Sequence, residues 1–227
     1  MFYFDPLYFI MIGPAMLLTI IAQGYVKSTF NKYMKVQGTK GYTGAETARE
    51  LLSTNDVNDV DVVMIQGKLS DHYDPIKKVL RLSQDVYTGR SLASVGVAAH
   101  EAGHAIQHAT GYMPLKLRHS FVPVANIGSQ LAFPLIIAGI FFKAFALTKV
   151  GIIFFSAAVL FQIITLPVEF NASSRALALI EKNGIVTSQE VGGARAVLNS
   201  AALTYVASAA VAVMQLLYFI MLSRGRD

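Results

Sequence analysis

The chain has 227 residues, of which 54% are hydrophobic, and its mean hydropathy of +0.49 is too high for an ordinary soluble domain. It contains no cysteine, which excludes disulfides, cysteine-ligated zinc and a thiol nucleophile. The net charge is +5, but there is no long basic tract with interleaved aromatic residues, so nothing supports nucleic-acid binding. The excess of lysine and arginine is better explained by a membrane surface.

Four apolar stretches are long enough to cross a bilayer, which takes about 20 helical residues. We expect spans from about Pro6 to Tyr25, Phe121 to Phe142, Val150 to Leu166, and Ala201 to Leu222. Asp5 fits as the N-cap of the first span, and the loop between the second and third contains Lys143 and Lys149. A cleaved signal peptide fits less well, because no basic residue precedes the first stretch. The length of the stretches also argues against buried helices of a soluble protein.

Lysine and arginine are unevenly distributed between the two sides of these spans. Fifteen of the nineteen lie between spans 1 and 2 or between spans 3 and 4, against four elsewhere. Because positive residues are enriched on the cytoplasmic side, this predicts that both large polar segments are cytoplasmic and that both termini are outside. Arg224 and Arg226 argue mildly against this orientation, and the polar segments are also the longer ones.

The first polar segment has the signals of a small α+β unit. Thr43 and Glu46 form a capping box that opens a short helix to about Leu52. Three short strands follow, with a turn at Asp74–Pro75 between the last two; they are expected at Val60–Gln66, Lys68–Tyr73 and Lys78–Ser83. An extended polypeptide could pair with an edge of this sheet, near Leu69–Tyr73 or Val79–Ser83.

A second capping box, Thr187 with Glu190, opens a helix toward Asn199 in the other polar segment. The sequence therefore predicts a mainly α, polytopic membrane protein with about four transmembrane helices and a small α+β unit between spans 1 and 2. Its expected parts are span 1 (1–26), the α+β segment (27–120), a transmembrane hairpin (121–168), a further segment with an amphipathic helix (169–200) and span 4 (201–227).

The most informative motif is His100-Glu101-Ala102-Gly103-His104, within a predicted helix from Ser91 to Thr110. Residues four apart lie on one helix face, about 6 Å apart along the axis. Two imidazoles in that arrangement can hold one Zn²⁺, while Glu101, turned about 100° around the helix, can reach a water on the metal. Small apolar residues surround the pair, and histidines buried among them need a partner. The pattern indicates a zinc peptidase rather than a solvated amphipathic face.

Two residues compete to be the third zinc ligand. His108 continues the four-residue spacing, but it lies about 12 Å along a continuous helix from His100, so all three histidines cannot reach one ion. Glu169 is the better candidate, because it is the only acidic residue between Glu101 and Glu181 and stands at the end of a span, where a lone carboxylate needs a partner.

These residues carry a family resemblance. HEAGH on a helix, two spans, then Glu169-Phe170-Asn171-Ala172-Ser173 resembles the HtpX-type membrane metallopeptidases. Over nearly the whole chain the sequence resembles the YugP-like family of membrane zinc metallopeptidases, through the stretches Gly44–Glu46, Asp71–Pro75, Arg81–Ser83, Ala99–Ala105 and Leu166–Phe170. The resemblance implies His100, His104 and Glu169 as zinc ligands and Glu101 as catalytic base. Ser173 stands where the HtpX-type pattern has an aspartate, so the hydrogen bonding of the ligands does not carry over.

The expected reaction is endopeptidase hydrolysis of a membrane-associated polypeptide, in which Glu101 assists the attack of zinc-bound water. Candidates for stabilising the developing negative charge on oxygen are His72, Tyr73, His119 and Arg175, with His72 and Tyr73 favoured. An intramembrane protease fits less well, because the second half of the Ser91–Thr110 helix is polar. A non-catalytic membrane scaffold, or a protein that binds or transports metal through the same cluster, is the alternative. Natural substrate, cleavage specificity and oligomeric state are not encoded in any recognisable pattern.

Overall fold

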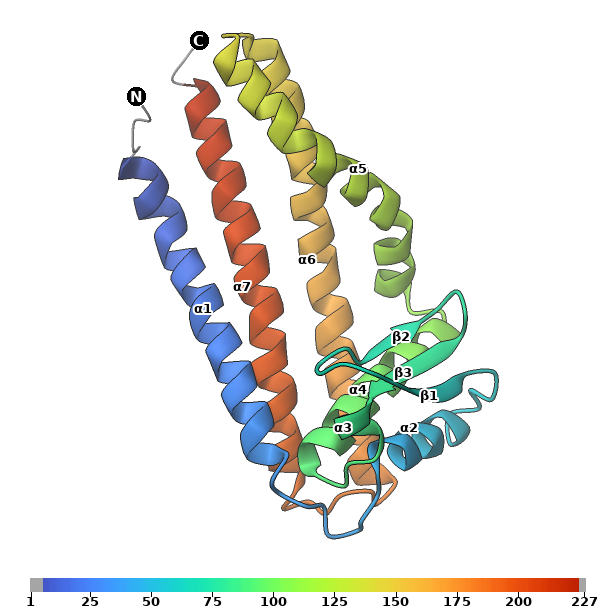
Figure 1. The fold of residues 1–227 in the computed structure, drawn as a ribbon. Helices are drawn as coiled ribbons and strands as arrows, with labels where there is room; N and C mark the ends of the chain where they lie inside the picture. Colours follow the sequence, from blue (N-terminus) through green and yellow to red (C-terminus); the bar gives the residue numbers. More distant parts are fainter. Residues whose placement is uncertain (1–5, 225–227) are drawn as a thin grey trace. The chain divides into compact units, whose positions relative to one another are not determined.

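The computed structural model describes residues 6–224 and is mainly helical (Figure 1). The predicted fold class, a mainly α polytopic protein with a small α+β unit, is confirmed. Asp5, expected as an N-cap, and Arg226 lie outside the described residues. In chain order the elements are α1 (Pro6–Tyr33), α2 (Gly44–Ser53), β1 (Asp61–Ile65), β2 (His72–Asp74), β3 (Val79–Ser83), α3 (Gln84–Tyr87), α4 (Leu92–Ala109), α5 (Met113–Phe141), α6 (Phe145–Lys182) and α7 (Val191–Arg224).

The described residues form two compact units. Unit 1 comprises residues 6–23, 116–167 and 204–224, which are the apolar parts of the four long helices. Unit 2 comprises residues 24–115 and 168–203 and contains the sheet, α2, α3, α4 and the polar ends of α1, α6 and α7. All residues of the HEAGH motif, together with Glu169, belong to unit 2.

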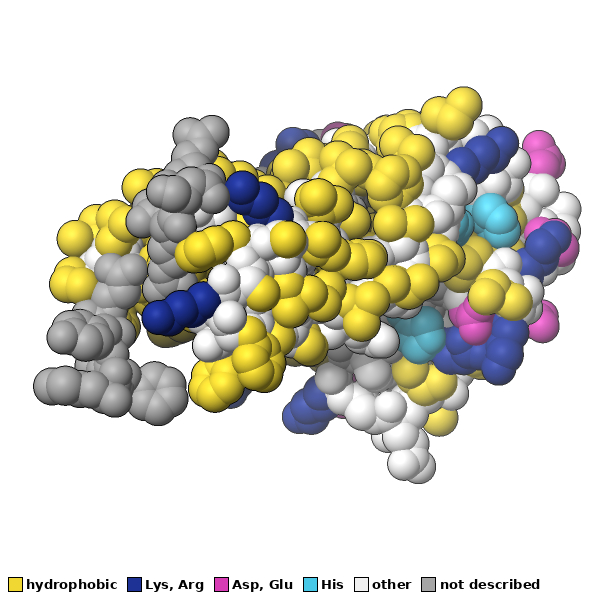
Figure 2. Space-filling model, turned by 90° about the horizontal axis from the view of Figure 1, so that it is seen from above, with side chains coloured by type: hydrophobic (Ala, Val, Ile, Leu, Met, Phe, Trp, Pro, Cys, Tyr) yellow, Lys and Arg dark blue, Asp and Glu magenta, His cyan; other side chains and the backbone are white. Residues whose placement is uncertain are grey.

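Unit 1 has the character of a membrane-spanning helical bundle. Each of its four helices is long and apolar enough to cross a membrane. An internal cluster joins α5, α6 and α7, in which the rings of Phe155 and Phe219 meet edge-on with their centroids 5.4 Å apart. Other faces expose large hydrophobic side chains, including Ile20, Ile137 and Ile153, each more than 60% exposed. Figure 2 shows hydrophobic side chains gathered over the middle of the face that it presents. Such continuous apolar surface is stable in lipid rather than in water.

The long helices continue past the expected ends of the spans. Helix α6 runs unbroken from the third apolar stretch into the polar segment, with Pro167 inside it, and α7 joins the predicted 187–199 helix to the last span. Lys149, expected in a loop, is therefore on the first turns of α6, whereas Lys143 occupies the turn with a positive φ of 54°. Hydropathy shows where the apolar part of a helix ends. The helix itself ends only where its backbone hydrogen bonds end.

The sheet of unit 2 has the order β1-β3-β2. Strand β3 pairs in parallel with β1 and antiparallel with β2, so it is the central strand. The expectation that Val79–Ser83 forms an edge is therefore wrong, because both of its backbone sides are already paired. Strand β2 is shorter than predicted and is an edge, as is β1. The capping box at Thr43 and Glu46 is confirmed, with both side-chain bonds present.

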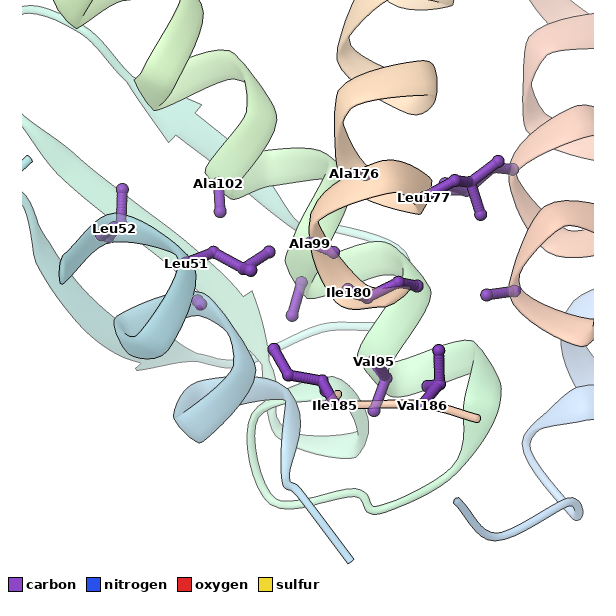
Figure 3. Packing of buried hydrophobic residues seen from close by; sticks show 14 of the residues in the cluster. Leu51, Leu52, Val95, Ala99, Ala102, Ala176, Leu177, Ile180, Ile185 and Val186 are labelled. Atoms are coloured by element: carbon purple, nitrogen blue, oxygen red, sulfur yellow. The ribbon is translucent and has the colours of Figure 1, made fainter. Parts of the chain in front are cut away.

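The core of unit 2 places α4 among α2 and the C-terminal part of α6 (Figure 3). Leu51 of α2, Ala99 of α4 and Ile180 of α6 are all fully buried and belong to one hydrophobic cluster. Of the twelve buried residues of α4, five are alanines and two are glycines, and these small residues leave room for close helix packing. A helix held on two sides by packed neighbours is a rigid support for the side chains on its remaining face.

Candidate metal centre

Helix α4 presents the two histidines from a well-defined frame. Ser91 is its N-cap, as predicted, with its side chain accepting from the Ser94 N–H, and Gly111 follows the helix with a φ of 65°. The rings of His100 and His104 lie on one face with centroids 4.7 Å apart, and their Nε2 atoms are 3.2 Å apart. Both side chains are largely buried, with exposed fractions of 13% and 12%.

Helix α6 brings Glu169 to this pair. Its Oε2 is 3.3 Å from His100 Nε2 and 3.4 Å from His104 Nε2, and its side chain is 4% exposed. Ligand atoms about 2.0–2.1 Å from a tetrahedral zinc lie about 3.3 Å from one another, so the three observed separations match such an ion. Three electron-pair donors at these distances repel one another unless a cation lies between them. The donor set therefore fits a metal.

Gly103, the small residue of HEAGH, allows the two helices to approach. A Cβ built on Gly103 would lie 2.8 Å from the carbonyl oxygen of Ala172 and 3.4 Å from its Cα, both on α6. The first distance is shorter than van der Waals contact permits, and backbone cannot rotate away as a flexible side chain would. The absent side chain thus sets the separation of α4 and α6, and with it the reach of Glu169.

Hydrogen-bond partners hold the ligand side chains on their far sides. Ser173 Oγ lies 3.1 Å from His100 Nδ1, so the serine at the HtpX-type aspartate position does contact a ligand histidine. Gln107 Oε1 lies 3.1 Å from His104 Nδ1. The sequence analysis missed Gln107 and its neighbour Asn171. The available signal was a glutamine directly after the apolar pair Ala105–Ile106 and three residues after His104.

The charges of the site favour a cation at His104. Burial by itself lowers the pKa of His104, but the nearby carboxylates of Glu169 and Glu101 outweigh it, so that the pKa of His104 lies above its usual value. The same carboxylates would stabilise a divalent metal at this point. Glu101 is half-buried on α4 and lies beside, not within, the three-residue cluster.

The remaining predicted candidates lie outside the cluster. His108 Nδ1 is 2.8 Å from the Tyr73 hydroxyl, so the structure places His108 against β2, not among the ligands. His72 Nδ1 is 2.7 Å from the Ser70 carbonyl oxygen. Arg175 donates from Nε to Asn171 and lies over the Tyr112 ring. His119 lies in the part of α5 that belongs to unit 1.

A polar cavity of about 630 Å³ lies beside α4 within unit 2. It is lined by residues of the α2–β1 connection together with Tyr73, Lys78, Ala105 and His108. Ala105 and His108 are within about 40° of Glu101 around the helix. The cavity therefore opens on the side of α4 that carries Glu101.

Comparison with known proteins gives a class for this centre. Residues 8–224 match the family model described as "Putative neutral zinc metallopeptidase". The chain belongs to this family. It is also 51% identical, over 211 residues, to the "Putative membrane protease YugP" of Bacillus subtilis (strain 168), which covers 92% of this chain and 94% of the relative. No solved structure matches the chain significantly. The predicted family and the predicted zinc cofactor are thereby confirmed at the level of the family.

Proposed function

We propose that this protein is a membrane-bound zinc-dependent endopeptidase whose site is built from His100, His104, Glu169 and Glu101. The observation that supports this most is the separation of three ligand atoms by 3.2 to 3.4 Å, with the carboxylate of Glu101 one residue from the first histidine. Membership of a zinc-metallopeptidase family and a relative named as a membrane protease agree with it.

The chemistry divides between the cofactor and the chain. Zinc, when bound by His100, His104 and Glu169, polarises a scissile carbonyl and makes water more acidic. Glu101 takes the proton of the attacking water and returns it to the leaving amine. Tyr73 remains protonated at working pH, because burial, and then the charges of Asp59 and Asp74, raise its pKa to about 12. Its phenol and the adjacent His108 are our favoured donors to substrate oxygen, ahead of His72.

The composition of the cluster favours a catalytic over a structural metal site. A structural zinc site has four protein ligands, whereas a catalytic one has three and an open position. Among the described residues, the histidine and carboxylate group that could hold a metal has three members. His108, which could have closed a fourth position, is engaged with Tyr73. A structural zinc site would need a fourth protein ligand, and the described cluster does not include one.

The cavity beside Glu101 suits a polypeptide substrate. Ala105 and His108 are four and seven residues past Glu101, which is about 6 to 10 Å along the helix. An extended chain covers that distance in about two to three residues. The cavity would therefore receive a side chain close to the cleaved bond, while edge strand β2 offers backbone groups to the same chain.

The site belongs at the cytoplasmic surface of the membrane in this proposal. Glu169 follows the apolar part of α6 by less than one helical turn, and the distribution of lysine and arginine favours a cytoplasmic position for the polar segments. Membrane proteins, or chains held near the bilayer, are the substrates that could reach such a position.

Substitution of Glu101 tests the mechanism. We would measure cleavage of an unfolded protein by the full-length protein in detergent, together with its zinc content, for wild type and Glu101→Gln. We expect the variant to retain zinc and to lose activity by about 10² to 10⁴-fold, since it lacks the base. Glu181→Gln, an exposed glutamate on α6, is the matched control. Unchanged cleavage by a zinc-loaded Glu101→Gln protein would rule out this mechanism.

A further inference from the structure

Gln107 connects the two helices that carry the proposed ligands. Its side chain is completely buried between α4 and α6. Its Oε1 is 3.1 Å from His104 Nδ1, and its Nε2 is 2.9 Å from both the Val168 carbonyl oxygen and Asn171 Oδ1. A single amide thus contacts one ligand histidine and holds the backbone and side chain on either side of Glu169.

The orientation of this amide follows from groups whose roles cannot be exchanged. The Val168 carbonyl only accepts hydrogen bonds, so the NH₂ of Gln107 must face α6. Arg175 Nε only donates, and it lies 2.8 Å from Asn171 Oδ1, which identifies that atom as the oxygen. Asn171 therefore also requires a donor from Gln107. The Val168 carbonyl oxygen and Asn171 Oδ1 thus both require the NH₂ of Gln107 to face α6, and the Oε1 of Gln107 must then face His104.

This orientation determines the state of His104. Because Oε1 is an acceptor, Nδ1 of His104 must carry the hydrogen, and its Nε2 then directs a lone pair at His100 Nε2 and Glu169 Oε2. The partner of His100 acts differently, because the Ser173 hydroxyl can donate or accept and so does not select a tautomer. The two ligand histidines are thus held with unequal specificity.

We infer that Gln107 is a positioning residue that fixes His104 in its metal-binding tautomer and keeps it in register with Glu169. The inference rests on the proposed zinc site and adds to it a residue that never touches the ion. Such hydrogen-bond partners of metal ligands commonly change metal affinity by about 10 to 100-fold when removed.

Zinc affinity, measured by competition with a chelator on the full-length protein in detergent, tests this inference without requiring activity. Gln107→Leu removes every hydrogen bond of the amide, so we expect its affinity to fall about 10 to 100-fold. Gln107→Glu keeps an acceptor for His104 but cannot donate to Val168 and Asn171. Its zinc affinity should therefore lie between that of the wild type and that of Gln107→Leu. The control is Thr47→Val on α2, which loses a buried hydroxyl bonded to the Thr43 carbonyl oxygen and should leave affinity unchanged.

The outcomes separate this inference from the proposed function. If the wild type binds zinc, His104→Ala abolishes binding, and both Gln107 variants stay within about threefold of wild type, the positioning role is refuted and the site survives. If the wild type binds no zinc, the proposed site itself fails. The visible absorption spectrum of the cobalt-substituted protein gives a second readout. A changed ligand field in Gln107→Glu, but not in Thr47→Val, supports the inference even where Gln107→Leu does not fold.

Discussion

Gly103 of α4 lies directly against the backbone of Ala172 of α6, and this contact sets how closely the two ligand-bearing helices approach. The motif spacing explains why two histidines face one ion, but it does not explain why a glycine stands between them. A β-carbon at this position would meet a carbonyl oxygen at 2.8 Å. In the proposed site, the glycine is therefore needed to bring Glu169, the third candidate ligand, from the other helix.

Gly103→Ala should weaken both the fold and the metal site. We expect a loss of stability of about 1 to 3 kcal/mol, because the clash is with backbone, and weaker zinc binding because Glu169 is pushed away. Gly96→Ala on the same helix is the matched control, since its added Cβ would meet Ala194 at an ordinary 3.5 Å. Thermal unfolding and zinc content measure both effects. Equal behaviour of the two variants would contradict the close approach.

Removing the carboxylate of Glu169 should remove the zinc. Glu169→Ala leaves only two histidines, so we expect zinc content to fall well below one ion per chain, whereas Glu181→Ala on the same helix should bind zinc normally. His108→Ala should also retain full zinc content, because His108 is bonded to Tyr73. Metal analysis of the purified proteins decides between Glu169 and His108 as the third ligand. Loss of zinc from His108→Ala would return that residue to the ligand set.

Acid should weaken the strand pair β2–β3 through Asp74. The backbone N–H of Lys77 and the Arg81 guanidinium lower the pKa of Asp74 to about 2, below the ordinary value of about 3.9. A lowered folded-state pKa contributes stability that is present above about pH 4 and is lost as the pH falls through about 2. Asp74→Asn should therefore be less stable than wild type near pH 6, and most of this difference should be gone near pH 2. Unfolding curves of zinc-depleted proteins at both pH values test this.

The orientation in the membrane can be tested because the chain has no cysteine of its own. A cysteine at Ile76, which is 92% exposed in the β2–β3 turn, should be protected from an impermeant thiol reagent in intact cells and labelled after lysis. A cysteine at Phe142, exposed in the α5–α6 turn, should be labelled without lysis. The reverse pattern would place the metal centre outside the cytoplasm.

Local signals in the sequence predicted local structure well. The capping box at Thr43 and the N-cap at Ser91 act over three residues, and both are present in the structure. Strand order depends on contacts between distant residues, so local sequence patterns do not reveal that β3 is the central strand. The pairing of His100 and His104 with Glu169 was expected from motif and resemblance. The Gln107 network was not, because a glutamine has no characteristic spacing and its role depends on which carbonyl lies opposite.

The division of the ligands between α4 and α6 has a consequence for biosynthesis. A ribosome releases the two histidines first, and Glu169 follows only after all of α5 and the apolar part of α6 have been made. A nascent chain therefore carries an incomplete set of ligands throughout the time in which its hairpin enters the bilayer. If the proposed peptidase activity is correct, competence for peptide-bond cleavage would therefore arise only after the residues of the hairpin have been synthesised.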